Sequence, residues 1–236
     1  GDVYKRQHPY QTSWGVSTRL VGMIIMAHGD DKGLKLPPKL APHQIVIVPI
    51  IPNDKDKDSV MKVVNQLNDS LGEFRVTIDD RSEVSPGFKF NEWEQKGVPL
   101  RVEVGPKDIE KNTILVSRRD DESKNSYPMD DVQNTIKTLL DEIQDNLYKN
   151  SENTLKENMT HVESFSELIE VLNSKKGFVS CFWKENKEDE LKIKEETSAT
   201  LRCYPLENTN SEKAVNSDSE NGLSLIHISE PTRQAS

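Results

Sequence analysis

Apolar residues along this chain alternate between the spacing of strands and the spacing of helices. Residues 44–51 form a continuous run rich in β-branched side chains, typical of a strand buried on both faces of a sheet. Between Val60 and Leu71 the apolar positions recur every three or four residues, which predicts a helix ending near Gly72. Further strands are predicted at 74–78, 99–104 and 113–117, and further helices at 89–95 and 129–148. This order predicts an α/β domain with a mainly parallel sheet.

A separate strand and helix are predicted near the N-terminus. Residues 10–13 have the pattern of the end of a short strand, and an apolar run with helical spacing follows Gly15 up to His28 and Gly29. Ser17 precedes this run and is the predicted N-cap. Three prolines within residues 35–42 then mark a linker to the α/β domain.

The C-terminal part is predicted to be a small α+β unit. Residues 177–183 and 199–204 have strand patterns, and a helix is predicted between them at 188–196. Residues 150–176 are polar and predicted to be helical in pieces. The segment 211–222 is rich in Ser, Asn and Glu and is predicted to be disordered.

Composition changes this picture mainly through the distribution of charge. The net charge is -9, 33% of residues are hydrophobic and the mean hydropathy is -0.71, which favours a soluble protein. Two cysteines without paired spacing favour a reducing compartment, in line with a cytoplasmic location. Residues 81–119 nevertheless contain eight Lys and Arg against six Asp and Glu, whereas residues 120–222 contain twelve against twenty-three. A phosphate-binding face in the middle of the chain is therefore compatible with the acidic total. No apolar run is long enough to span a bilayer.

The start of the first helix is a candidate phosphate site. Ser17, Thr18 and Arg19 lie in its first turn, where free backbone N–H groups and the helix dipole favour an anion. An arginine near a helix cap is also common in ordinary amphipathic helices. Local pattern alone leaves both interpretations open.

A resemblance adds to this local reading. TSWGVSTR, followed by MAHGDDKGLKLPPKLAP, resembles motif 3 of class II aminoacyl-tRNA synthetases, in the form found in prolyl-tRNA synthetases of the archaeal/eukaryotic-like type. The resemblance implies that Arg19 contacts the γ-phosphate and adenine of ATP, beside Ser17 and Thr18. It also implies that the floor of the adenylate pocket is lined by Ser13, Trp14 and Gly15. For the signature that begins at His28, helix termination with Gly29 as C-cap is the simpler interpretation.

A second block, DDRSEVSPGFKFNEWEQKGVPLRVEVGPKD at 79–108, resembles the anticodon-binding domain of the same family. Arg101 can bind the O6 and N7 edge of guanine, and Glu94 can accept from its N1–H and amino group. Phe90 offers a stacking surface for an unpaired base, and Lys107 a cation for a phosphate.

Each of these anticodon-binding candidates has an ordinary structural alternative. Phe90 would be a core residue, Glu94 and Lys107 solvated surface residues, and Arg101 an exposed residue paired with Glu103. The two other aromatic residues of the block, Phe88 and Trp93, are assigned to packing.

The resemblance also implies a domain organisation and an activity. Residues 8–38 would end a class II catalytic domain, 39–150 would be the anticodon-binding domain, and 151–210 an incomplete C-terminal domain. The parent enzyme would join proline to tRNA(Pro) with ATP and Mg²⁺, as a homodimer. This chain lacks motifs 1 and 2, so anticodon recognition without ligase activity is expected of it. A stand-alone RNA-binding module and a threonyl, glycyl or histidyl synthetase are the alternatives.

Zinc is not expected. Many relatives carry a C-terminal site of four cysteines, which suits tetrahedral thiolate coordination. Here the two cysteines, Cys181 and Cys203, lack paired spacing.

The two ends of the chain are related through their coding sequence. Residues 2–7 can be encoded by GATGTGTATAAGAGACAG, and the reverse complement of that string translates as residues 223–228. The relation resembles a transposon end used in sequencing libraries. We therefore predict that residues 1–7 and 223–236 are encoded by adapters, and we exclude them from functional reasoning.

Overall fold

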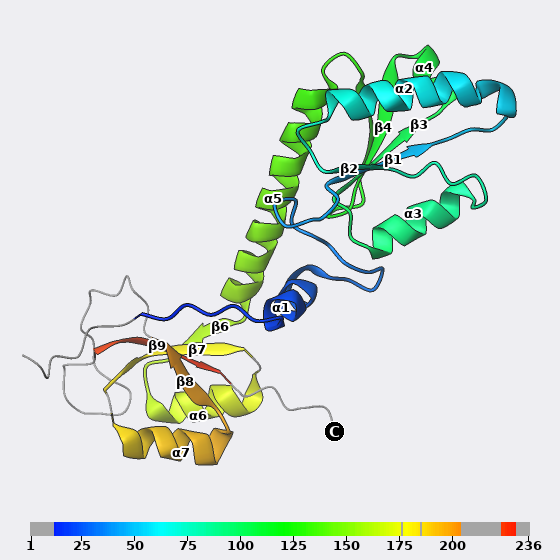
Figure 1. Ribbon diagram of the computed structural model, residues 1–236. Coiled ribbons are helices and arrows are strands. Elements are labelled where there is room, and N and C mark those ends of the chain that lie inside the picture. The colour runs from blue at the N-terminus through cyan, green and yellow to red at the C-terminus, as the bar shows by residue number, and fades with distance from the viewer. Residues whose placement is uncertain (1–11, 176, 185, 204–222, 230–236) are drawn as a thin grey trace, which may run out of the picture. The chain divides into compact units, whose positions relative to one another are not determined.

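The computed structural model describes residues 12–175, 177–184 and 186–203, together with the strand at 223–229 (Figure 1). The chain forms two compact units, residues 1–151 and 152–236. The N-terminal adapter prediction, the first two residues of the strand expected at 10–13, and the expected disorder at 211–222 lie outside the described residues.

The first unit is built on a five-stranded mixed sheet of order β2-β1-β3-β4-β5. The central strand β1 (Ile45–Pro49) pairs in parallel with β2 (Val76–Ile78) and β3 (Leu100–Val104), whereas β4 (Thr113–Arg118) and β5 (Lys124–Pro128) continue it antiparallel. The α/β class is confirmed, but the expected dominance of parallel pairing is wrong. The five residues between β4 and β5 are too few for a crossover, so these two strands form a hairpin.

Helices cover both faces of this sheet, which explains the unbroken apolar run of β1. Ile45 and Ile47 belong to a core shared with α2 (Lys57–Ser70) and α5 (Val132–Glu157). Val46 and Val48 face the opposite way and pack with Trp93 of α3 (Pro86–Gln95). Figure 1 shows α2 and α3 on opposite sides of the sheet. Alternate side chains of a strand point to opposite faces, so every position of β1 is buried.

Several boundaries in this unit differ from the sequence prediction. The helix α3 begins at Pro86, earlier than position 89, because Ser85 caps it by accepting from the Phe88 N–H and Pro86 fits the first helical position. The short elements η2 (Asp54–Asp56), α4 (Pro106–Glu110) and β5 were not expected, since their sequences are polar and lack periodicity. Packing is confirmed for Trp93, but it is wrong for Phe88, which is 57% exposed because it lies on the outer face of α3.

The N-terminal helix α1 (Arg19–His28) stands out from the sheet. Its N-cap is Thr18 rather than Ser17, whose hydroxyl instead accepts from the Arg19 N–H at 3.4 Å. Gly29 ends the helix as expected, since its N–H donates to the Ile25 carbonyl and a Cβ there would lie 2.6 Å from that oxygen. Every residue of α1 is at least partly exposed, and Thr12 and Ser13 lie in no strand.

The predicted linker is packed against the first unit rather than free. Pro37, Pro38 and Ala41 are buried. The Arg75 side chain donates to the carbonyls of Pro38 and Ala41, both at 2.8 Å. These contacts fix the path of the chain into β1.

The second unit has a four-stranded sheet of order β6-β7-β9-β8. Its elements are β6 (Met159–His161), α6 (Phe165–Ser174), β7 (Phe178–Trp183), α7 (Lys187–Thr197), β8 (Thr200–Cys203) and β9 (Leu223–Ser229). The strands and helix predicted at 177–183, 188–196 and 199–204 are confirmed with small shifts. The strand β9 covers part of the predicted adapter residues, whose origin stays a prediction. None of the described helices has the length and apolar character needed to cross a membrane.

Candidate nucleic-acid interface

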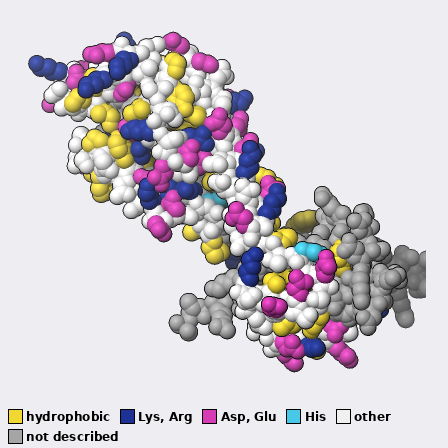
Figure 2. Space-filling model, turned by 180° about the vertical axis from the view of Figure 1, so that it is seen from behind, with side chains coloured by type: hydrophobic (Ala, Val, Ile, Leu, Met, Phe, Trp, Pro, Cys, Tyr) yellow, Lys and Arg dark blue, Asp and Glu magenta, His cyan; other side chains and the backbone are white. Residues whose placement is uncertain are grey.

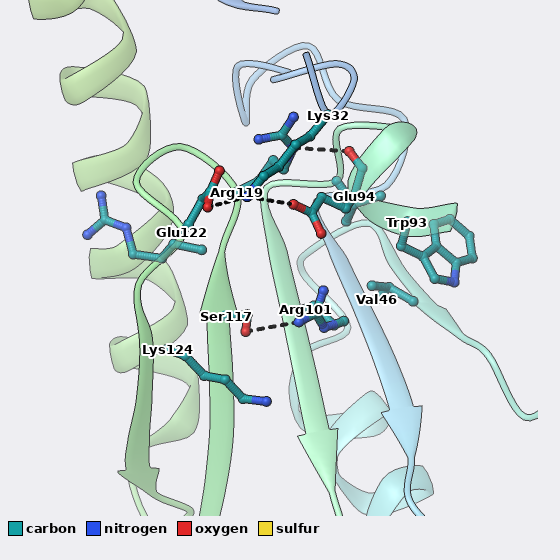
Figure 3. A pocket seen from close by; sticks show the side chains of 11 residues that line it. Lys32, Val46, Trp93, Glu94, Arg101, Ser117, Arg119, Glu122 and Lys124 are labelled. Carbon is teal, nitrogen blue, oxygen red and sulfur yellow. Dashed lines mark hydrogen bonds and ion pairs between the residues drawn. The ribbon is translucent and has the colours of Figure 1, made fainter. Parts of the chain in front are cut away.

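One cross-strand row of side chains forms the floor of a pocket on the α3 face of the first sheet. The pairing register places Val46 opposite Arg101, Arg101 opposite Ser117, and Ser117 opposite Lys124. Residues opposite each other in neighbouring strands project from the same face of a sheet. All four side chains line the pocket, as Figure 3 shows. The sequence predicted only Arg101 of this row.

The helix α3 supplies one wall of the pocket. Phe90 and Glu94 are four residues apart, so they project from the same side of the helix, with Trp93 beside them. The Arg101 guanidinium carbon lies 4.2 Å from the centre of the Phe90 ring, and Lys124 Nζ lies 5.6 Å from it. Phe90 therefore carries a cation on its ring and also packs against the Val46 and Trp93 cluster.

A buried carboxylate holds the two cations of the floor in place. Glu103, whose side chain is 7% exposed, accepts from Arg101 Nε at 3.2 Å and from Lys124 Nζ at 2.9 Å. Arg101 Nη2 also donates to the Ser117 hydroxyl at 3.2 Å. Among the described residues, no hydrogen bond is made by Arg101 Nη1. The expected pairing of Arg101 with Glu103 is present, but Arg101 is only 17% exposed and lines the pocket rather than the open surface.

The second wall combines residues from the segment after α1 with residues of the β4–β5 turn. Lys32 Nζ binds Glu122 at 2.5 Å and lies 3.9 Å from Glu94 Oε1. The whole pocket has a volume of about 240 Å³. Its charged lining consists of five cations, Lys32, Arg101, Arg118, Arg119 and Lys124, and two carboxylates, Glu94 and Glu122. Figure 2 shows Lys and Arg interspersed with Asp and Glu on the side of the molecule that it presents. The pocket lining thus has an excess of cations, although the whole chain has a net charge of -9.

A network of buried polar groups fixes α3 against the sheet. Asp79, at the end of β2, accepts from Trp93 Nε1 at 2.7 Å and from Arg81 at 2.7 and 2.8 Å. Arg81 also binds Glu92 of α3 at 2.7 Å. Hydrogen bonds from Arg81, aided by Trp93, lower the pKa of the Asp79 carboxyl to about 2. The carboxylate thus stays ionised and holds the helix that carries Phe90 and Glu94.

The structure does not bring Lys107 to this pocket. Lys107 is exposed in the first turn of α4, beyond the far end of β3 from Arg101. A phosphate contact by Lys107 stays a prediction and would involve a different nucleotide. Lys124 was missed because β5 has no alternating pattern, whereas Ser117 and Arg119, within and just after the predicted strand at 113–117, have no local feature that indicates a pocket. The Asp-Asp-Glu-Ser sequence before Lys124 is a turn signal that favours a hairpin there.

The six residues assigned to ATP and adenylate binding lie together but form no enclosure by themselves. All of them are exposed: Ser13, Trp14, Gly15, Ser17, Thr18 and Arg19. Arg19 stands at the N-terminus of α1, so the residue types and their placement fit one side of a nucleotide site. Within the described part of the chain, these side chains therefore supply one wall of such a site and not a whole pocket.

The absence of a zinc site stays a prediction, because Cys181 alone of the two cysteines has its side chain in the part of the chain that is described. There, no three His, Cys, Asp or Glu side chains gather as a metal site would require. Cys181 is buried in the core of the second unit, and burial raises the pKa of its thiol to about 12.

The mixed sheet, with a cation-lined pocket under α3, defines an anticodon-binding domain of the class II aminoacyl-tRNA synthetase type. The family model described as "Anticodon binding domain" matches residues 44–139, and that described as "Prolyl-tRNA synthetase, C-terminal" matches residues 165–222. The chain therefore corresponds to the C-terminal region of prolyl-tRNA synthetases, with their anticodon-binding and C-terminal domains.

Individual relatives agree with this assignment. The chain is 47% identical to a proline--tRNA ligase of Roseiflexus sp. over 205 residues, and 47% identical to one of Alkaliphilus oremlandii. These alignments cover 85% and 86% of the chain and 42% of each relative. A crystal structure of the Cryptosporidium parvum prolyl-tRNA synthetase, complexed with L-proline and AMP, matches with a TM-score of 0.80 and 36% identity, covering 90% of this chain and 46% of that one. The chain thus spans less than half the length of the relatives it matches.

Proposed function

We propose that the first unit of this chain binds the anticodon of tRNA(Pro) and reads its guanines in the pocket under α3. The single observation that carries the proposal is the row formed by Arg101, Ser117 and Lys124, facing Glu94 across the pocket. Arg101 presents a planar fork that suits the O6 and N7 edge of guanine, and Glu94 offers a carboxylate to the N1–H and amino group. A base entering the pocket can stack over Arg101 and Phe90, which already lie one above the other.

The parent protein is proposed to be a proline--tRNA ligase. It would activate proline with ATP, accompanied by Mg²⁺, and pass the prolyl group to tRNA(Pro), as a homodimer in the cytoplasm. In that protein Arg19, Ser17 and Thr18 would bind ATP, while Ser13, Trp14 and Gly15 would line the adenylate pocket. The names of the relatives and the proline and AMP of the Cryptosporidium structure support this proposal.

We expect no aminoacylation by the chain itself. The residues proposed for ATP binding are exposed and form only one wall of a site. Its recognition of RNA is expected to be independent of ATP.

Binding of short RNA hairpins tests the proposed function. The hairpins carry the proline anticodon or a variant in which one of its two guanines is replaced by adenine. We expect each replacement to weaken binding by about 1–3 kcal/mol. Arg101→Ala should abolish the preference at one guanine only. Lys62→Ala, which removes an exposed cation of α2 on the opposite face of the sheet, is the matched control. Equal affinity of the unsubstituted chain for all the hairpins would exclude anticodon recognition.

A further inference from the structure

We infer that Asp30 and Arg119 form a clasp that positions Glu94 for base recognition, so that the segment following α1 and the anticodon pocket are coupled. This inference rests on the proposed function and adds two positioning residues to it. Neither residue needs to touch RNA for this role, because both act through the end of α3.

The clasp is a fully formed bidentate ion pair. Arg119 Nη1 and Nη2 donate to the two carboxylate oxygens of Asp30 at 2.9 and 2.6 Å. The Arg119 side chain is only 4% exposed, whereas that of Asp30 is 28% exposed. Lys35 Nζ adds a second cation 3.1 Å from Asp30. Hydrogen bonds from Arg119 hold the pKa of Asp30 well below its usual range, so the carboxylate keeps its charge at physiological pH.

The third donor of the Arg119 side chain connects the clasp to Glu94, which is proposed to bind guanine. Arg119 Nε donates to the backbone carbonyl of Glu94 at 3.0 Å. The backbone N–H of Arg119 itself donates to Pro99, just before β3. Arg119 therefore joins Asp30 and the last turn of α3 through its guanidinium, and the residue before β3 through its backbone N–H. Figure 3 shows Arg119, Lys32 and Glu94 close together at this end of the pocket.

Backbone pairing extends the contact along the segment after α1. Leu34 N–H donates to the Gln95 carbonyl at 3.0 Å, and Leu36 N–H donates to the Gly97 carbonyl at 3.2 Å. The close approach requires glycine on both sides. Gly33 has φ +138° and a Cβ there would lie 2.5 Å from Gln95 Cα, and Gly97 has φ +72° with a Cβ 2.6 Å from Leu34 Cβ.

Through Lys32, the segment after α1 also lines the pocket directly. It lines the pocket, binds Glu122 and lies 3.9 Å from the Glu94 carboxylate. A base that engages Glu94 therefore meets a carboxylate that lies 3.9 Å from Lys32, a residue outside the matched anticodon-binding region, 44–139, while Arg119, inside that region, holds the Glu94 backbone. Because coupling between two sites is reciprocal, RNA bound in the pocket should also stabilise the clasp.

Asp30→Asn in the full chain tests the coupling, with Asp31→Asn, its exposed neighbour, as the matched control. The Glu94→Gln variant first identifies the anticodon position at which Glu94 sets the guanine preference. The readout is then the ratio of affinities for hairpins that carry guanine or adenine at that position. We expect Asp30→Asn to reduce this ratio about five- to tenfold and Asp31→Asn to leave it unchanged. The preference at the guanine read by Arg101 should be retained, which a general loss of folding would not allow. Arg119→Lys, which keeps the charge but loses the fork, should resemble Asp30→Asn.

Amide hydrogen exchange gives a second measurement that needs no RNA. Asp30→Asn should increase exchange at Leu34 and Leu36 and leave β1 protected, and adding hairpin RNA to the unsubstituted chain should slow exchange at those amides. An unchanged guanine ratio in Asp30→Asn would overturn the clasp and leave the proposed function standing. Absence of guanine preference in the unsubstituted chain would overturn both.

Discussion

The guanidinium of Arg101 lies over the ring of Phe90, with its central carbon 4.2 Å from the ring centre. Phe90 is thus neither a free stacking platform nor a simple core residue. It supports the cation that is proposed to read guanine, and its own ring packs against the cluster around Val46.

Removing this support should weaken recognition without unfolding the domain. We expect Phe90→Leu to cost about 1 kcal/mol in affinity for the anticodon hairpin, because the cation–π contact that orients Arg101 is lost. Phe88→Leu, a change of the same size on the exposed side of α3, should have little effect. Titrations of both variants with the guanine and adenine hairpins check this. Equal losses in the two variants would contradict the role given to Phe90.

Lys124 and Lys107 should differ in the salt dependence of binding. If Lys107 contacts only phosphate, Lys107→Ala should lower affinity equally for all hairpins and reduce the slope of log K against log salt by about 0.7. Lys124 is held by Glu103 in the pocket, so Lys124→Ala should also alter base preference. Affinities measured at several salt concentrations separate the two effects. An unchanged slope in Lys107→Ala would remove Lys107 from the interface.

The buried Asp79 should make the first unit sensitive to acid. Because its pKa in the folded state is about 2, below the ordinary value of 3.8 for an aspartate, its stabilisation is complete above pH 3.8 and is lost as the pH falls through 2. We expect this contribution to be about 2 kcal/mol. Asp79→Asn should be less stable than the unsubstituted chain at pH 7, but it should lose less stability as the pH falls. Urea unfolding of both chains at pH 7, 4 and 2.5 measures this difference. Asp80→Asn, at an exposed neighbour, should follow the unsubstituted chain.

The docking of residues 30–36 should depend on Gly33. We expect Gly33→Ala to cost more than about 1 kcal/mol and to expose this segment to proteolysis, since both its φ and its contact with Gln95 exclude a Cβ. Gly87→Ala is the control, because a Cβ there meets open space and helix propensity favours alanine. Similar proteolysis rates for the two variants would contradict the docking.

The thiol of Cys181 should be inert while the second unit is folded. Burial raises the pKa of this thiol to about 12. Its thiolate population at pH 8 is therefore about a thousandfold lower than that of a thiol whose pKa is 9.0. Alkylation by iodoacetamide in a Cys203→Ser background, followed by mass spectrometry, should be slow without urea and fast in urea. Rapid alkylation of the folded chain would place Cys181 nearer the surface.

The sequence by itself determined the class of the fold, the family and part of the site. The β-branched run of β1 required burial on both faces, and helical spacing located α1, α2 and most of α5. Motif resemblance singled out Glu94 and Arg101, which line one pocket, and Phe90, whose ring lies against Arg101. It also singled out Lys107, which the structure places elsewhere.

Only the tertiary structure decided which further residues join that pocket. The turn signal before Lys124 favours a hairpin, but it does not set the register that places Lys124 opposite Ser117 and Ser117 opposite Arg101. Nor does any local signal pair Asp30 with Arg119, which are 89 residues apart. Gly33 and Gly97 let the segment after α1 approach the end of α3, where this pair lies. Local sequence sets which elements form, whereas long-range packing sets which side chains face one another.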